Sequence, residues 1–489
     1  MIKALKNQKV VVMIIALATL MRLVAINQSL WLDEAIGAIV VRDYSYGEIL
    51  TEFIRSDNHT PLYYLDLKFW SDIFGHSELS LRLPSVIYGV LTIYIVYLIA
   101  QKLAGVKNQL FPILTILLLA TSQFHIYYSQ EARMYSLATF FVSLAVYAFL
   151  NVLEDKDNFY WKLFSFSIVG LIFTDYVPVF VLPIFVVYAP LKKKKAKWWG
   201  KFVLYGIPLF ILGTAWLPTM LVQVRNYVGL LSHLPAWKQV AGGATFKQAV
   251  LVWMKFVFGR ISLVDKFLYY LLVCLASIPV VVSMINSLVK TSCKKINIVW
   301  LWLVLPLICG FLVSFVFPVF IYFRFMYVIP AFYMMIAWGI AQMRKKGLRY
   351  VVVVLLLISN FVSWIIYITD DHQQREQWRQ ATRFVEKSVV EGDVIIFEYP
   401  EPFAPYRWYS SREVEAYGVT DSVSADSAKT EQITRYRIAE KSGVYYFEYL
   451  RELSDPDRVV EKVLREEGFE VSEIYNFSGV GLVYYWTRE

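Results

Sequence analysis

The sequence predicts an α-helical protein that crosses a membrane many times and ends in a small α/β domain. The chain of 489 residues is 58% hydrophobic, and its mean hydropathy is +0.50. Only 18% of the residues are charged, whereas soluble proteins carry about 25%. Apolar runs close to the ~20 residues that span a bilayer recur along the first three quarters of the chain. The remainder has the charge content and alternation of a soluble domain.

The apolar runs predict eleven transmembrane helices. The fifth and sixth runs are short and separated only by Asp175-Tyr176. An odd number of spans places the two ends of the chain on opposite sides of the membrane. The predicted spans are 10–27, 83–101, 109–126, 135–152, 163–175, 177–190, 202–222, 267–288, 298–317, 325–342 and 349–369.

Basic residues gather in the short loops between these spans. With eleven spans, all of these loops fall on the N-terminal side, which the positive-inside rule assigns to the cytoplasm. The net charge of +9 therefore reflects topology, and we expect no nucleic-acid partner. The residues concerned are Lys3, Lys6, Lys9, Lys102, Lys107, Lys192 to Lys195, Lys197, Lys201, Lys290, Lys294, Lys295, Arg344, Lys345, Lys346 and Arg349.

The N-terminal apolar run reads as a retained anchor, because it follows a basic start and lacks a small-residue cleavage site. The three cysteines, Cys274, Cys293 and Cys309, fall in no predicted external segment. We therefore expect neither a disulfide framework nor a cysteine metal site.

Four segments are predicted on the external side. They are a long loop over 28–82, the short turn Tyr127 to Met134, a loop over 223–266 with Pro235 and Gly242-Gly243, and the C-terminal region 370–489. The first loop is rich in apolar residues, so parts of it are expected to lie in the membrane interface as amphipathic helices. Residues 1–369 form the predicted transmembrane module.

The C-terminal region 370–489 alternates between strand and helix patterns. Alternating apolar residues predict strands over 393–399, 444–447 and 481–486. Helical spacing predicts helices over 378–390 and 458–467. A region of this size is enough for one small domain, and the odd number of spans places it outside.

Two adjacent carboxylates, Asp33 and Glu34, directly follow the first predicted span. Charges at the hydrocarbon boundary are costly and often functional, and a carboxylate there can act as general base on an acceptor hydroxyl. The alternative is a helix N-terminal turn, where the helix dipole favours acidic residues. The local sequence supports both interpretations equally.

Two arginines on the external side are candidates for binding phosphate, because the planar guanidinium donates two parallel hydrogen bonds. Arg133 lies two residues after Glu131 in the second external turn, and Arg324 begins the tenth span among aromatic residues. The alternative for the turn is an internal Arg–carboxylate pair. The alternative for Arg324 is a side chain that snorkels to the interface.

Taken together, the order and spacing of several motifs resemble the polyprenyl-phosphate-sugar-dependent GT-C glycosyltransferases of glycosyltransferase family 39. That group includes the protein O-mannosyltransferases and the lipid A aminoarabinose transferase. The motifs are Ser29-Leu30-Trp31-Leu32-Asp33-Glu34-Ala35, His59-Thr60-Pro61-Leu62-Tyr63-Tyr64, Ser80-Leu81-Arg82-Leu83-Pro84-Ser85, Tyr128-Ser129-Gln130-Glu131-Ala132-Arg133-Met134-Tyr135, Arg324 with Pro330, and Glu376-Gln377-Trp378-Arg379 leading into Glu391-Gly392-Asp393-Val394.

The resemblance implies transfer of a sugar, with inversion, from a polyprenyl-phosphate donor on the outer face of the cytoplasmic membrane. It implies Asp33 as general base, with Glu34 positioning the acceptor or the base. It implies Arg133, Arg324 and Glu131 near the donor phosphate. The remaining motif residues are expected to contact substrate. They are His59, Tyr63, Arg82, Tyr128 and Tyr135.

The residue at position 60 departs from the family pattern, in which the histidine is usually followed by two prolines: Thr60 replaces the first of them. No metal-ligand pattern is evident, and because some relatives bind a divalent cation, such an ion is the only cofactor left open. The acceptor, whether lipid, glycan or protein, is not specified. The C-terminal domain is expected to help select it.

Two other function classes fit parts of the pattern. A lipid or sugar transporter or flippase also carries boundary charges, but it predicts internal repeats and interrupted spans, and no repeat is visible. An oligosaccharide ligase or polymerase would use the same lipid donors with a larger transferred unit. A single-sugar transferase remains the main prediction.

Overall fold

The computed structural model describes residues 2–105, 109–154, 157–192, 194–233, 241–289, 296–411, 413–423 and 425–488, with side chains from residue 8 onward and without that of His233. Several residues named above lie outside this part of the chain. They are Lys107, Lys193, Pro235, Lys290, Cys293, Lys294 and Lys295, together with the side chains of Lys3 and Lys6.

The chain forms two compact units. The first, called here the helical unit, comprises Met1–Ile26, Ser45–Arg225 and Ala241–Thr369. The second, called the sheet unit, comprises Asn27–Tyr44, Asn226–Val240 and Asp370–Glu489. The sheet unit therefore includes the segment with Asp33 and Glu34, which the sequence assigns to the first loop of the transmembrane module.

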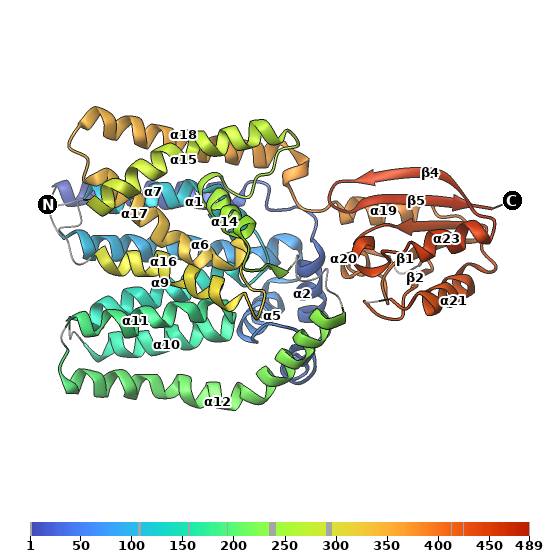
Figure 1. Cartoon of the computed structure of the whole chain (residues 1–489), viewed down its shortest axis with the longest axis horizontal. Coiled ribbons are helices and arrows are strands. Elements are labelled where there is room, and N and C mark those ends of the chain that lie inside the picture. Colours follow the sequence, from blue (N-terminus) through green and yellow to red (C-terminus); the bar gives the residue numbers. More distant parts are fainter. Residues whose placement is uncertain are drawn as a thin grey trace. The chain divides into compact units, whose positions relative to one another are not determined.

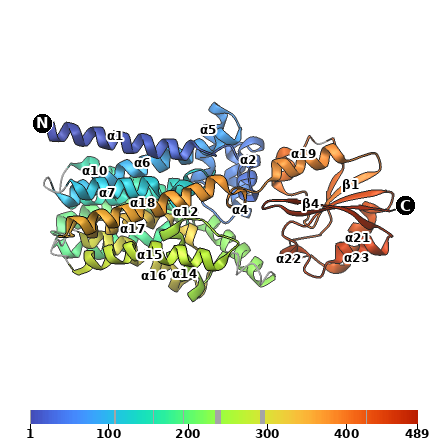
Figure 2. The same ribbon diagram turned by 90° about the horizontal axis from the view of Figure 1, so that it is seen from above.

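The long helices of the helical unit run side by side as a bundle (Figures 1 and 2). Helix α9 packs against α6 and α10, and α7 packs against α6 and α17. The bundle elements are α1 (Ile2–Leu23), α6 (Glu78–Ala104), α7 (Leu110–Thr121), α8 (Gln123–Ser129), α9 (Tyr135–Val152), α10 (Asn158–Thr174), η2 (Val177–Val181), α11 (Leu182–Tyr188), η3 (Pro190–Lys192), α12 (Ala196–His233), α14 (Phe246–Phe258), α15 (Lys266–Val289), α16 (Asn297–Val313), η5 (Tyr322–Val328), α17 (Ile329–Ala341) and α18 (Lys346–Thr369).

The predicted helical membrane architecture is confirmed at the level of apolar helices. Among the described residues, six helices are long and apolar enough to cross a membrane, or up to seven if the bent pair α7 and α8 counts as one span. The segments 177–192 and 297–313 are apolar but shorter. Each of the eleven predicted spans overlaps helix in the structure, although the first and ninth extend four residues beyond the ends of α1 and α16.

Two larger differences from the prediction lie at the third and seventh spans. The span predicted over 109–126 breaks at Ser122, and α8 leaves the axis of α7 by 60°. Ser122 causes this break locally, because its extended backbone ends α7 and its hydroxyl accepts the backbone N–H of His125 at the start of α8. The external loop predicted from residue 223 begins later, because α12 continues to His233.

The first external segment is largely helical. In the helical unit it contains α3 (Tyr46–Glu48), η1 (Ile49–Phe53), α4 (Ile54–Ser56) and α5 (Leu62–Phe74). A capping box between Ser45 and Glu48 starts the first of these helices. Helix α5 buries Tyr63 and Tyr64 but leaves Phe69 about 61% exposed, as expected for a helix that lies in an apolar interface.

The sheet unit is built on one mixed five-stranded sheet with the strand order β2-β1-β3-β5-β4. Strand β1 pairs in parallel with β2 and β3, whereas β5 pairs in antiparallel with β3 and β4. The strands are β1 (Asp393–Phe397), β2 (Ala416–Gly418), β3 (Gly443–Phe447), β4 (Glu470–Phe477) and β5 (Gly481–Thr487).

Helices cover both faces of the sheet, so the predicted C-terminal domain is a three-layer α/β/α structure (Figure 2). Strand residues alternate between two cores: Ile395 packs with the helices α19 and α20, and Ile396 packs with α21 and α23. The helices of this unit are α2 (Leu32–Asp43), η6 (Asp371–Gln373), α19 (Trp378–Ser388), α20 (Ala404–Tyr409), α21 (Ser427–Ile438), α22 (Arg451–Ser454) and α23 (Val459–Glu466).

Candidate functional site

Asp33 and Glu34 occupy the first turn of α2. This position is favourable for both, since acidic side chains interact well with the N-terminal end of the helix dipole. The two carboxylates differ in access: Glu34 is completely buried, whereas Asp33 is partly exposed. Of the pair, therefore, Asp33 is the carboxylate that can meet an acceptor hydroxyl directly.

The sheet unit holds the extended segment that leads into α2. Helix α2 packs against α20, and three hydrogen bonds fix the residues before it. The bonds run from Arg375 N to Gln28 Oε1 at 2.8 Å, from Arg379 N to Ser29 Oγ at 3.0 Å, and from Leu30 N to Tyr409 Oη at 2.8 Å.

Glu376 is a further acidic residue near Asp33. It belongs to one of the motifs of the family resemblance, but the sequence predicted no role for it. Its carboxylate accepts hydrogen bonds from the Trp378 indole at 2.8 Å, from the Tyr449 hydroxyl at 3.1 Å, and from the backbone N–H of Leu32. It therefore binds the residue next to Asp33. Burial raises the pKa of Glu376 to about 7, and the charge of Asp33 adds to this effect while the hydrogen bonds oppose it.

In the helical unit, His59 lies between Asp57 and Arg133. The imidazole Nδ1 is 3.1 Å from an Asp57 oxygen, and Arg133 Nη2 is 3.4 Å from Nε2. Because a guanidinium can only donate, Nε2 accepts and the ring proton lies on Nδ1, facing Asp57. Burial raises the pKa of Asp57, but His59 and Arg133 outweigh it and lower the pKa to about 2.

Gln223 of α12 anchors the loop that carries His59. Its buried amide donates to the carbonyls of Ile54 at 2.6 Å and His59 at 2.9 Å. The Tyr176 hydroxyl donates to the Gln223 amide oxygen at 2.5 Å, which fixes the orientation of the amide. Sequence reasoning missed both Asp57 and Gln223. Asp57 lies only two residues before a motif histidine, and this proximity was the available signal.

Arg82 is buried and donates from Nη1 to the carbonyl of Ile26 at 2.7 Å. This contact holds the last residue before the segment that leads to Asp33. Glu131 and Arg133 are also buried, 2% and 4% exposed, and the backbone N–H of Arg133 donates to the Glu131 carbonyl at 2.8 Å. The second external turn is therefore packed inside the protein and is not an open surface loop.

Aromatic rings join the Arg133 turn to the Arg324 helix. The Tyr128 and Tyr135 rings are 5.4 Å apart, and the Phe323 ring lies 5.5 Å from Tyr135. Arg324 is partly exposed, and its Nη1 reaches the Pro318 carbonyl at 3.5 Å. The structure thus gathers the elements that carry both arginines around one aromatic cluster within the helical unit.

Tyr63 is 4% exposed and its ring lies 5.3 Å from that of Tyr64 at the start of α5. Within the described residues, no group of three or more His, Cys, Asp or Glu side chains is arranged to hold a metal ion.

An apolar cavity of about 440 Å³ opens among α14, α15, α16 and α17. Trp253 and Phe256 line it from α14, Leu307 and Phe311 from α16, and Phe332 from α17. The apolar lining of this cavity suits a hydrocarbon chain. The helix η5, which carries Arg324, packs against three of the four helices, α14, α16 and α17.

Residues 58–219 match the protein family described as dolichyl-phosphate-mannose-protein mannosyltransferase. This match covers His59, Tyr63, Arg82, Tyr128, Glu131, Arg133 and Tyr135, and it confirms the family resemblance predicted from the motifs.

A relative from Aquifex aeolicus (strain VF5), described as an uncharacterized protein, is 25% identical over 325 residues. The alignment covers 58% of this chain and 63% of the relative, so the chain spans less than two thirds of that protein's length.

Three solved structures share the fold. The crystal structure of ArnT from Cupriavidus metallidurans in the apo state has a TM-score of 0.59 at 10% identity and covers 97% of both chains. The same protein bound to undecaprenyl phosphate has a TM-score of 0.58, with the same identity and coverage. An oligosaccharyltransferase from Archaeoglobus fulgidus, tethered with an acceptor peptide, has a TM-score of 0.52 at 13% identity over 99% of this chain and 74% of its own.

Proposed function

We propose that this chain, whose residues 58–219 belong to a mannosyltransferase-type family and whose fold is that of ArnT, is an inverting membrane glycosyltransferase. It moves a sugar from a polyprenyl-phosphate donor to an acceptor hydroxyl. The observation that carries this proposal is the buried Arg133 beside His59, inside the family match.

The chemistry needs one base and a set of cations. Asp33 takes the proton of the acceptor hydroxyl, and the oxygen attacks the anomeric carbon from the side opposite the phosphate. The bond from that carbon to the phosphate oxygen breaks as the new glycosidic bond forms, which inverts the configuration. Arg133 and Arg324 stabilise the charge on the departing phosphate, so no general acid is required.

The supporting residues divide between binding and orientation. His59 orients the Arg133 guanidinium and is itself fixed by Asp57 and Gln223. Tyr128 and Tyr135 shape the wall between the arginines. Glu34 and Glu376 support the helix that presents Asp33.

The donor lipid is accommodated in the apolar cavity among α14 to α17. A structural neighbour, ArnT, is known with undecaprenyl phosphate bound, which supports a polyprenyl phosphate as the carrier. No residue of this cavity specifies the sugar.

We assign the chain eleven spans, with the N-terminus in the cytoplasm and residues 370–489 on the outer face of the cytoplasmic membrane. The lysine-rich loops support this orientation. The donor and acceptor then meet on the outer side, in the synthesis of cell-surface glycans, lipopolysaccharide or glycoproteins.

The test is sugar transfer by the full-length protein in nanodiscs with synthetic undecaprenyl-phosphate sugars and total membrane extract as acceptor. Mass spectrometry should detect a single added hexose or pentose and free undecaprenyl phosphate. No transfer from these donors, together with transfer from an undecaprenyl-pyrophosphate-linked oligosaccharide supplied in a parallel reaction, would contradict the proposal and favour a ligase.

A further inference from the structure

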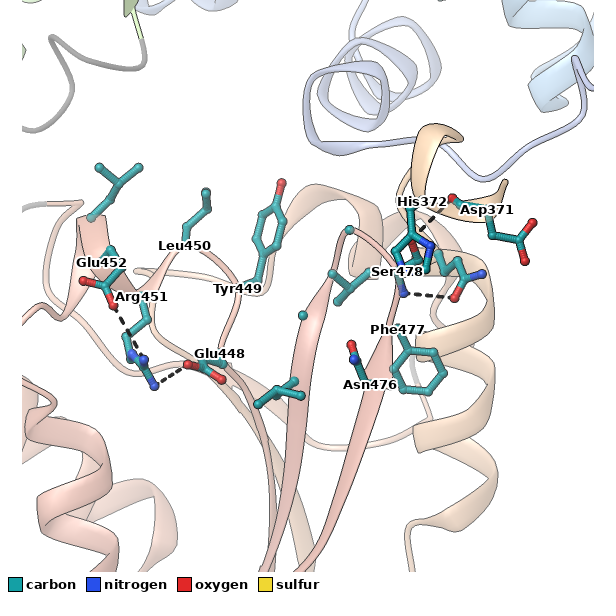
Figure 3. Close-up of a pocket in the computed structure, with 16 residues that line it drawn as sticks. Asp371, His372, Glu448, Tyr449, Leu450, Arg451, Glu452, Asn476, Phe477 and Ser478 are labelled. Carbon is teal, nitrogen blue, oxygen red and sulfur yellow. Dashed lines mark hydrogen bonds and ion pairs between the residues drawn. The ribbon is translucent and has the colours of Figure 1, made fainter. Parts of the chain in front are cut away.

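The sheet unit contains an open hollow of about 900 Å³ beside the C-terminal end of β3 (Figure 3). It is lined by residues 448–453 after β3, by 476–482 at the turn between β4 and β5, and by Asp371, His372 and Gln377. In open sheets with parallel strands, ligands bind outside the carboxyl ends of those strands. The hollow meets the sheet at the C-terminal end of one of its parallel strands, β3, on the side where the antiparallel β5 pairs with it.

The wall of the hollow contains a backbone outlier. Leu450 adopts the left-handed conformation, with φ 61°, which is strongly disfavoured for a branched side chain. Gly479 and Gly481 on the opposite side also have positive φ, 77° and 90°. Non-glycine residues held in such conformations cluster at binding sites, whereas the two glycines adopt positive φ without strain.

Acidic groups dominate the charge of the hollow. Asp371, Glu448 and Glu452 contribute carboxylates, and Arg451 is the lining arginine. Arg451 is already engaged, because it pairs with Glu448, with Glu452 at 3.6 Å and with Glu461 at 2.9 Å. In Figure 3 the pairs of Arg451 with Glu448 and Glu452 lie on one side of the hollow, across from Asp371, His372 and Ser478. Such a lining repels phosphate and carboxylate and accepts hydrogen bonds from hydroxyl and ammonium groups.

The hollow is connected to the segment of the proposed base. Tyr449 lines the hollow, and its hydroxyl donates to Glu376 at 3.1 Å. Glu376 in turn accepts the backbone N–H of Leu32, directly before Asp33. All of these residues belong to the sheet unit, so a ligand in the hollow is one side chain away from the carboxylate that supports α2.

We infer that this hollow binds a neutral or amino-bearing saccharide portion of the acceptor. The inference rests on the proposed glycosyl transfer and names the class of its acceptor. The exposed Asn476 amide and the carboxylates supply the hydrogen-bonding groups that a polyol needs. A peptide would instead pair along the edge of β4, the outermost strand, of which only residues 476 and 477 line the hollow.

The experiment measures saccharide binding by the full-length protein in nanodiscs, with donor absent. The probes are three disaccharides analysed by calorimetry: N,N′-diacetylchitobiose, which is neutral, chitobiose, which carries two amines, and digalacturonate, which carries two carboxylates. The first two should bind with millimolar or tighter affinity. The third should bind at least tenfold more weakly.

A matched pair of variants locates the binding. Asn476→Arg places a long cationic side chain in the hollow, and it should weaken binding of both favoured disaccharides at least tenfold. Ser472→Arg makes the same change in charge and size at an exposed position of the same strand outside the hollow, and it should leave binding unchanged.

Equal binding of all three disaccharides, equal loss in both variants, or no saccharide binding would overturn the inference. Binding of a Ser/Thr-rich peptide that is lost in Asn476→Arg would also overturn it and indicate a protein acceptor. Because no sugar is transferred in this experiment, a failure of saccharide binding can be distinguished from a failure of the proposed glycosyl transfer.

Discussion

Glu376 offers the sharpest test of the contacts around Asp33, because its protonation is coupled to folding. Its pKa rises from 4.5 to about 7 in the folded protein, first through burial and further through the charge of Asp33. A raised folded-state pKa means that this contribution to stability is fully present below pH 4.5 and is lost as the pH rises through 7.

At 1.36 kcal/mol per pKa unit, the raised pKa of Glu376 corresponds to roughly 3 kcal/mol of unfolding free energy, which is lost when the carboxyl ionises. Glu376 is partly accessible to solvent, so screening should reduce the measurable effect to about 1–2 kcal/mol. Glu376→Gln keeps an oxygen for the Trp378 indole and the Tyr449 hydroxyl but cannot ionise. The variant should therefore lose this part of the pH dependence.

The assay is thermal unfolding of the full-length protein in nanodiscs at pH 5 and pH 8. From pH 5 to pH 8, the unfolding temperature of the wild type should drop by more than that of Glu376→Gln. A control variant, Glu440→Gln, changes an exposed carboxylate of the same unit and should behave as wild type. Equal pH dependence in wild type and Glu376→Gln would refute the coupling.

Three further substitutions test the helical unit. Arg133→Ala should raise the KM for the lipid donor at least tenfold, since a buried phosphate-binding cation is lost. Arg55→Ala, at an exposed position of the first external segment, should leave this KM unchanged, and equal kinetics of the two variants would contradict the assignment. Gln223→Ala removes two hydrogen bonds to the loop of His59, worth about 1–3 kcal/mol, so hydrogen exchange at residues 54–60 should accelerate. Arg82→Ala leaves the Ile26 carbonyl without its donor and should lower the free energy of unfolding by about 2–4 kcal/mol, and an unchanged unfolding midpoint would argue against that role.

Local patterns were sufficient for much of the fold. Long apolar runs imply membrane helices, and the alternating apolar pattern identified strands β1, β3 and β5, of which β1 and β3 are fully buried. Strand β4 was missed because it lies at the edge of the sheet and is mostly exposed, so it lacks the apolar alternation of a buried strand. Ser122 broke a predicted span because a cap hydroxyl outweighed the continuous apolar pattern around it.

The candidate site was predictable only as separate motifs. The sequence indicated Asp33, Arg133 and His59, yet their supporting contacts join residues far apart in the chain. Leu30 bonds Tyr409 across 379 positions, and Gln223 bonds His59 across 164. Such pairs depend on the tertiary fold and leave no local spacing pattern. The role of Glu376 beside Leu32 was hidden for the same reason.

The most direct test of the central proposal is sugar transfer by Asp33→Asn in nanodiscs with an undecaprenyl-phosphate sugar donor. Asp43→Asn makes the same change at the other end of α2, where Asp43 pairs with Arg42 on the surface, and serves as the control. Loss of a general base typically reduces turnover about 100- to 10,000-fold, so we expect that loss for Asp33→Asn and near wild-type turnover for Asp43→Asn. Turnover near the wild-type value in Asp33→Asn would contradict the assignment of Asp33 as the base.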